Sequence, residues 1–227
     1  MKIQPIAYYH SQLPTKFGVP RQSGLVPELV GRVVFEAEYA NPDALRGIEG
    51  FDYLWLIWEF SLNGKGEGEW ASLVRPPLLG GNEYVGVFAT RSPFRPNALG
   101  LSSVRLLGVE NENGRPVLVV AGADMVDGTP IYDVKPYVEY SDAHTGVRSG
   151  FVDERQWTKV NVSVPDEFRK VFSEEDFITL CKILELDPRP QYHKDPERVY
   201  GMPFAGYDIR FKVSQSGLLE VVAVDAL

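Results

Sequence analysis

The chain has 227 residues, 44% of them hydrophobic, and its acidic residues outnumber its basic residues to give a net charge of −8. This apolar content excludes wholesale disorder, and the acidic balance argues against a protein that coats nucleic acid. The single cysteine, Cys181, excludes an intrachain disulfide. We expect a cytoplasmic protein, because the N-terminus lacks the apolar core of a signal peptide and no apolar run is long enough to span a bilayer.

The first two thirds of the chain predict short strands separated by Gly, Pro and Asn. The expected strands are residues 3–8, 30–36, 53–60, 84–89, 101–109 and 117–121, which are rich in β-branched and aromatic residues. Asn113-Gly114, between the last two strands, predicts a tight hairpin. Trp55 and Trp58 are three residues apart, so in a strand they face opposite sides. Because no long helix separates these strands, we expect an antiparallel sheet or barrel.

Helical periodicity is clear only in residues 165–186. Pro165 suits a first helical turn, and Ser173 followed by Asp176 can start a second helix within this span. DPRP (residues 187–190) ends the helical region. Residues 157–164, 207–214 and 218–223 are expected to be extended, with a turn at Gly217 between the last two. We therefore expect a main domain over residues 1–143 and a small α+β domain over residues 151–227.

The stretch ATRSPFRPNALGLS (residues 89–102) combines two prolines and two arginines, which helix and strand interiors avoid. Residues 70–105 hold four arginines against one acidic residue, in an otherwise acidic chain. A local cationic patch of this kind can bind an anionic ligand. Pro93 and Pro96 would stiffen the backbone that presents Arg91 and Arg95.

A second polar stretch, ADMVDGTPIYDVKPY (residues 123–137), contains Asp124, Asp127, Asp133 and Lys135. Asp-Gly-Thr-Pro is a turn signal, so these residues can have a purely structural role in forming a turn. Alternatively, the carboxylates can hold ribose hydroxyls, a cationic group or a metal, and the sequence does not distinguish among these ligands. The histidines and Cys181 lack metal-ligand spacing, so no metal site is expected.

Several stretches together resemble the TsaA-like, TrmO-type family. ATRSPFRPNALGLSSVRL (residues 89–106) is very similar to the family signature. Four further motifs follow the family order: VPRQSGL (19–25), RGIEGFDYLWLIWEF (46–60), VRPPLLGGN (74–82) and DMVDGTPIYDVKPY (124–137). The tail, residues 187–211, is similar to the bacterial long form, so the resemblance covers nearly the whole chain.

This resemblance implies an S-adenosylmethionine-dependent tRNA methyltransferase that acts on N6 of N6-threonylcarbamoyladenosine, beside the anticodon of threonine tRNAs. It also implies a single β-barrel domain, a small C-terminal domain and a homodimer. No membrane contact is expected. Two alternatives stay open: a non-catalytic module that senses S-adenosylmethionine or a nucleotide, and an RNA-binding accessory protein, whose affinity would fall steeply with salt.

By motif match, the resemblance assigns the cofactor to three polar loops and the end of the third strand. The residues are Arg21, Gln22, Ser23, Ser61, Leu62, Arg91, Leu101, Asp124, Met125, Val126 and Asp127. Arg91 suits the cofactor carboxylate, because a guanidinium binds it bidentately. Ser61 departs from the family, which often has a histidine there.

The same resemblance gives candidates for the reaction and for the tRNA. Asp127 is the candidate general base that takes the proton from N6. The expected tRNA contacts, through phosphates and stacked bases, are Arg95, Asn97, Lys135, Tyr137, Arg189 and Tyr192.

Overall fold

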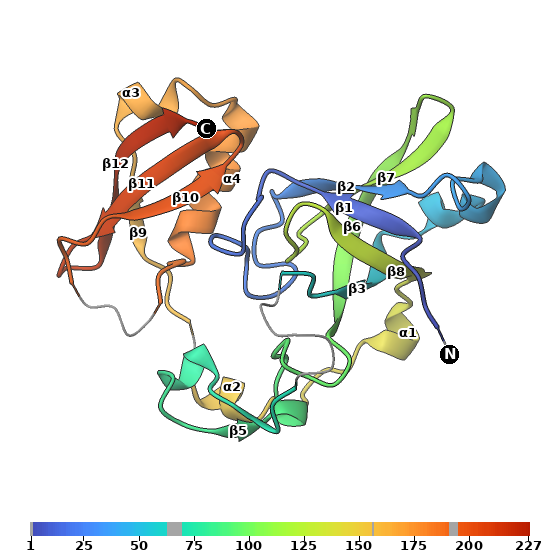
Figure 1. The fold of residues 1–227 in the computed structure, drawn as a ribbon, viewed down its shortest axis with the longest axis horizontal. Coiled ribbons are helices and arrows are strands. Elements are labelled where there is room, and N and C mark those ends of the chain that lie inside the picture. Colours follow the sequence, from blue (N-terminus) through green and yellow to red (C-terminus); the bar gives the residue numbers. More distant parts are fainter. Residues whose placement is uncertain (1, 63–69, 156, 191–194) are drawn as a thin grey trace.

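Strands from the N-terminal part of the chain form a closed ring, which is blue to green in Figure 1. The computed structural model describes residues 2–62, 70–155, 157–190 and 195–227. The ring contains β1 (Ala7–His10), β2 (Val30–Phe35), β3 (Tyr53–Glu59), β6 (Leu99–Glu112), β7 (Arg115–Ala121) and β8 (Thr129–Pro136). Its order is β1–β2–β7–β6–β3–β8, and the antiparallel pairing of β8 with β1 closes it. The expected mainly β, antiparallel architecture is therefore confirmed.

Alternate side chains of the strands fill the interior of the ring. In β3, Leu54, Leu56 and Trp58 are buried, whereas Trp55 is only partly buried. Successive side chains of a strand point to opposite faces, so this alternation follows from the strand itself. Trp55 and Trp58 thus face opposite sides, as the sequence predicts. The indole Nε1 of Trp55 donates to the carboxylate of Asp142 at 2.8 Å.

The hairpin between β6 and β7 forms at the predicted position. Glu112 pairs with Arg115 across the turn, and Asn113 and Gly114 have φ values of 52° and 83°. Two successive positive φ values define the turn type that matches the twist of a hairpin. Asn and Gly are the residues that adopt this conformation at low cost, which explains why this pair predicts the turn.

The C-terminal part of the chain forms a smaller α+β unit. Its sheet has the order β10–β11–β12–β9, from β9 (Asn161–Ser163), β10 (Tyr200–Phe204), β11 (Tyr207–Val213) and β12 (Leu218–Ala226). The helices are α3 (Asp166–Arg169) and α4 (Glu174–Glu185). Ser173 caps α4, since its side chain accepts from the Asp176 N–H at 3.1 Å. The predicted second helix start at Ser173 is therefore confirmed.

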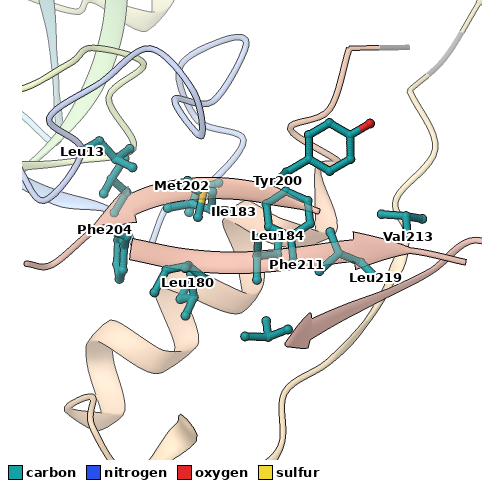
Figure 2. Close-up of a cluster of buried hydrophobic side chains, with 14 residues drawn as sticks. Leu13, Leu180, Ile183, Leu184, Tyr200, Met202, Phe204, Phe211, Val213 and Leu219 are labelled. Carbon is teal, nitrogen blue, oxygen red and sulfur yellow. The ribbon is translucent and has the colours of Figure 1, made fainter. Parts of the chain in front are cut away.

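The connection between β1 and β2 packs against this C-terminal unit. Leu13, Val26 and Leu29 are fully buried in the same cluster as the apolar side chains of α4, β10, β11 and β12. Figure 2 shows Leu13 beside the strand that carries Met202 and Phe204. The first connection of the ring therefore supplies part of the C-terminal core, and its polar loop is fixed between the two parts.

Short elements complete the described structure. They are β4 (Leu73–Val74), β5 (Val85–Gly86), α1 (Glu139–Asp142), α2 (Phe151–Glu154) and four 3-10 helices, η1 (Pro42–Leu45), η2 (Ile48–Gly50), η3 (Pro77–Leu79) and η4 (Val87–Ala89). In the residues that the structure describes, no helix has the length and apolar content needed to cross a membrane. Those residues also contain no group of three or more His, Cys, Asp or Glu side chains that could hold a metal.

Several strand predictions were wrong in position or missing. The expected strand 84–89 is only two residues of β5 followed by η4, because its partner β4 is equally short. The first strand begins at Ala7 rather than at residue 3. The strands β8 and β10 were not predicted, since Pro130, Pro136 and Pro203 lie inside them and proline is unusual in strands.

Candidate functional site

A chain of hydrogen bonds links β3, β6 and the connection after β7. The Trp58 indole Nε1 donates to the Ser102 hydroxyl at 2.9 Å, and that hydroxyl donates to Asp124 Oδ1 at 2.5 Å. Gly100 makes room for this arrangement, because a Cβ there would lie 2.2 Å from the Trp58 ring. The glycine of the signature stretch therefore lets the indole lie across β6 and reach Ser102.

The carboxyl group of Asp124 is partly buried. Burial raises its pKa, while hydrogen bonds from Ser102, its own backbone N–H and the Ser23 backbone, together with the charge of Arg91, oppose that rise. Burying a carboxylate costs free energy unless donors and a cation compensate. Asp124 therefore has its donors and its cation in place before any ligand arrives.

Arg91 lies in the loop after η4 and contacts the loop PRQS (residues 20–23). Its Nη1 donates to Gln22 Oε1, and its charge acts on Asp124. The Ser23 backbone also bonds to Asp124. The structure thus brings together Gln22, Ser23, Arg91 and Asp124, four of the residues that the resemblance assigns to the cofactor.

Arg95 fixes the shape of the loop that carries Arg91. Its Nη1 donates to the backbone carbonyls of Thr90 at 3.1 Å and Ser92 at 3.2 Å. The Thr90 hydroxyl oxygen in turn accepts from the Ser92 N–H at 3.2 Å. One arginine of the stretch therefore supports the backbone, while the other points toward Gln22.

Met125, Val126 and Asp127 follow Asp124 in the turn before β8. The side chains of Met125 and Val126 are buried, so the turn presents mainly their backbone. Asp127 is exposed, lies 3.0 Å from His10 Nδ1 and accepts from the Ser11 N–H at 3.1 Å. The two aspartates of the turn therefore have different partners: Asp124 faces Ser102 and Arg91, and Asp127 faces the end of β1.

The remaining cofactor candidates lie outside this group of contacts. The Arg21 guanidinium donates to backbone carbonyls of the C-terminal unit, at Leu186 and Asp187. Ser61 follows β3, and Leu62 and Leu101 are 49% and 58% exposed. The exposed leucines offer apolar surface.

The tRNA candidates are dispersed over both parts of the chain. Asn97 is exposed, Lys135 pairs with Asp133 at 2.8 Å, and the Tyr137 ring lies 5.7 Å from that of Trp55. Arg189 makes two hydrogen bonds to the Asp187 carboxylate, each 2.8 Å long. Tyr192 lies outside the described residues.

Ser102 and Trp58 are part of the site although the sequence analysis did not assign them to it. The available signal was strand alternation: Ser102 shares the inward face of β6 with Gly100 and Val104, so a hydroxyl side chain stands where an apolar one is expected. A buried hydroxyl requires a hydrogen-bond partner. That partner is Asp124, from a segment 22 residues later.

Comparison with known proteins identifies relatives along the full chain. The model described as "tRNA-methyltransferase O N-terminal domain" matches residues 8–143, and "TrmO C-terminal domain" matches residues 159–227. The tRNA (adenine(37)-N6)-methyltransferase of Escherichia coli strain K12 is 35% identical over 232 residues, covering 99% of this chain and 97% of that protein. A Pseudomonas aeruginosa protein, RcsF, which is named for dependence on S-adenosylmethionine, is 36% identical over 231 residues, covering 98% and 96%. A crystal structure of TrmO from Pseudomonas aeruginosa has a TM-score of 0.78 and 29% identity, with coverage of 100% of this chain and 99% of that one.

The raised pKa of Asp124 leads to a testable pH dependence of stability. A carboxyl whose pKa is higher in the folded than in the unfolded state binds its proton more tightly when folded, so its ionisation opposes folding as the pH rises. The free energy of unfolding of an Asp124→Asn variant, minus that of the wild type, should therefore increase from about pH 4 to about pH 7. Urea denaturation at several pH values measures this difference, and parallel curves for the two proteins would contradict it.

Proposed function

This chain belongs to the tRNA-methyltransferase O family, and on that premise we propose that it methylates N6 of N6-threonylcarbamoyladenosine, beside the anticodon of threonine tRNA. Its methyl donor is S-adenosylmethionine, and the product is an N6-methylated adenosine derivative. We place this reaction in the cytoplasm.

The observation that carries the proposal is the shielded carboxylate of Asp124 beside Arg91. S-adenosylmethionine combines a carboxylate, an ammonium, a sulfonium and ribose hydroxyls, and it supplies an electrophilic methyl group. A guanidinium suits the carboxylate, whereas Asp124 suits a cationic group or the ribose hydroxyls. Arg91 and Asp124 thus offer one positive and one negative group, which match the carboxylate and the cationic groups of S-adenosylmethionine. The residues present therefore fit the cofactor.

The surrounding residues support binding in the same place. Gln22 and Ser23 hold Arg91 and Asp124 from the other side of the site. Ser61, Leu62, Leu101 and the backbone of Met125 and Val126 would complete the pocket. Ligand pockets typically combine apolar walls with a few placed polar groups. Ser61 stands where the family often has histidine. A contact made by its backbone would not depend on which side chain is present.

The reaction also requires the removal of a proton. N6 gains a bond to the methyl carbon, the bond between that carbon and sulfur breaks, and the hydrogen on N6 leaves as a proton. Asp127 is our proposed acceptor, because it is an exposed carboxylate whose neighbour in space, His10, can pass the proton on to solvent. Alignment of the reacting atoms supplies the rest of the rate enhancement.

Replacement of Asp127 by Asn tests this role. We expect kcat to fall on the order of a hundredfold or more, because general base catalysis contributes that much, while the Kd for S-adenosylmethionine changes little. Asp43→Asn, which alters another exposed carboxylate, is the matched control and should retain kcat. A variant Asp127→Asn with wild-type kcat would remove Asp127 from the mechanism.

The tRNA is proposed to meet cations and aromatic rings along β3, from the loop of residues 89–102 to the end of β8. Asn97 and Arg95 belong to that loop, which enters β6 where Leu99 pairs with Glu59. Lys135 of β8 pairs with Trp55, nearer the start of β3, and Tyr137 follows β8 at that end. Because the whole chain is acidic, binding would depend on this local cationic surface and would weaken as salt rises. Arg189 would contribute from the C-terminal unit, and Tyr192, which lies outside the described residues, is also a proposed contact.

We also propose that the chain forms a homodimer through an apolar surface around β4 and β5. This β4–β5 surface consists of Trp70, Leu73, Tyr84, Phe88 and Phe94, which are 37–72% exposed. The rings of Trp70 and Phe88 stack at 6.2 Å, so the surface is continuous there. Apolar patches on a surface commonly mark interfaces, and a second copy would cover this one in a closed, two-fold manner.

Phe88→Glu should convert the dimer to a monomer, because Phe88 is 72% exposed on the β4–β5 surface and a charge there would be buried in the interface. Light scattering coupled to size-exclusion chromatography measures the mass. Tyr140→Glu is the control, since Tyr140 is an aromatic residue of α1 that is 93% exposed and lies outside this surface. A monomeric wild type would contradict the homodimer.

The division of the chain into residues 1–143 and 151–227 remains part of this proposal. It is supported by the separate closed ring and four-stranded sheet, and by the absence of strands from residues 137–160 among those described. The packing of Leu13, Val26 and Leu29 into the C-terminal core qualifies the division, because these residues belong to the first unit in sequence and to the second in space.

A methyl-transfer assay tests the function as a whole. Purified protein and labelled S-adenosylmethionine are incubated with tRNA from cells that make, or lack, the threonylcarbamoyl modification. Label is expected only in the modified tRNA, on threonine isoacceptors. Label in both pools would overturn the proposed substrate, and cofactor binding without any transfer would favour the sensing module instead.

A further inference from the structure

The side chain of Arg21 crosses from the β1–β2 connection to the C-terminal unit. Its Nη1 donates to the Leu186 carbonyl and its Nη2 to the Asp187 carbonyl, each at 2.6 Å. Its guanidinium also lies 3.8 Å from the centre of the Trp157 ring. The last carbonyls of a helix lack partners within the helix, so a guanidinium at the end of α4 satisfies two otherwise open acceptors.

The second of these acceptors belongs to a buried residue whose side chain is also hydrogen-bonded. The Asp187 backbone has a φ of 49°, and the residue is only 7% exposed. Its carboxylate accepts two hydrogen bonds from Arg189, whose side chain is 16% exposed. Asp187 therefore combines an unusual backbone conformation with a bidentate side-chain pair, and its carbonyl accepts from Arg21. The C-terminal unit therefore presents Arg21 with preformed hydrogen-bond acceptors, the carbonyls of Leu186 and Asp187.

The backbone of Arg21 leads directly to the candidate cofactor site. The Arg21 carbonyl accepts from Gln22 Nε2 at 2.5 Å, and Gln22 Oε1 accepts from Arg91. The next residue, Ser23, bonds to Asp124 through its backbone. Movement of residue 21 would therefore displace the groups that hold both Arg91 and Asp124.

We propose that Arg21 is a positioning residue that fixes the loop of residues 20–23 to the end of α4, so that the C-terminal unit sets the geometry of the cofactor site. Arg21 acts through Gln22 and Ser23, in place of direct contact with the cofactor. The inference rests on the proposed function, because it takes the group around Arg91 and Asp124 to bind S-adenosylmethionine.

The test is the Kd for S-adenosylmethionine, measured by calorimetry without tRNA. Arg21→Ala should raise the Kd by about tenfold or more, because hydrogen bonds of a charged group are lost and the loop must be ordered on binding. Arg189→Ala removes only the support of Asp187 and should also raise the Kd. Since both residues act through one contact, the double variant should bind no more weakly than Arg21→Ala.

Arg169→Ala is the matched control. Arg169 also combines carboxylate hydrogen bonds with an aromatic ring, at Glu174 and Phe177, but these partners lie within the C-terminal unit. This variant should bind the cofactor like the wild type. Arg21→Lys can reach one carbonyl but not both, so its Kd should lie between those of the wild type and Arg21→Ala. Circular dichroism and thermal melting monitor folding. If Arg21→Ala does not fold, the Kd values of Arg21→Lys and Arg189→Ala are compared with that of the wild type instead.

The outcomes separate this inference from the proposed function. A wild type that fails to bind S-adenosylmethionine overturns the proposed function. A wild type that binds, together with Arg21 and Arg189 variants of unchanged Kd, overturns only the positioning role. Additive effects in the double variant also overturn it and assign Arg21 to direct cofactor contact.

Discussion

A carboxylate removed from water needs donors, and the surroundings of Asp124 follow from that requirement. Its hydrogen bonds come from β6, from the β1–β2 connection and from its own backbone, so three distant stretches of sequence must meet. Gly100 exists as glycine because the Trp58 ring, which orients Ser102, occupies the space of a side chain. The stiff, arginine-containing loop then adds the cation. Together these features compensate the partial burial of Asp124.

The β1–β2 connection joins the two parts of the molecule and the site. Its apolar residues Leu13, Val26 and Leu29 enter the C-terminal core, while its polar residues Gln22 and Ser23 reach Arg91 and Asp124. Apolar packing therefore anchors both ends of a loop whose centre carries the polar contacts. A loop anchored in this way loses less freedom when a ligand binds.

Much of the ring and the start of α4 were predictable from sequence, because local signals agree there with the final structure. The alternation in β3, the Asn113-Gly114 turn and the Ser173 cap are short-range features, and each lies where it was predicted. The strands β8 and β10 were missed because prolines lie within them, and the strand predicted over residues 84–89 is only two residues long because its partner is short. The polar loops were predicted, but the different partners of Asp124 and Asp127 could not be, since they depend on long-range contacts with Ser102 and His10.

The sharing of one core between the two ends of the chain bears on biosynthesis. Leu13 is made early, whereas Met202, Phe204 and Leu219, which belong to the same cluster, are made about 190 residues later or more (Figure 2). Chains emerge from the ribosome N-terminus first, so the β1–β2 connection has no complete core until residue 219 has emerged. Until then its apolar side chains lack their partners, and the loop that carries Gln22 and Ser23 lacks its anchors. The cofactor site that we propose around Arg91 and Asp124 would therefore reach its final geometry late in folding.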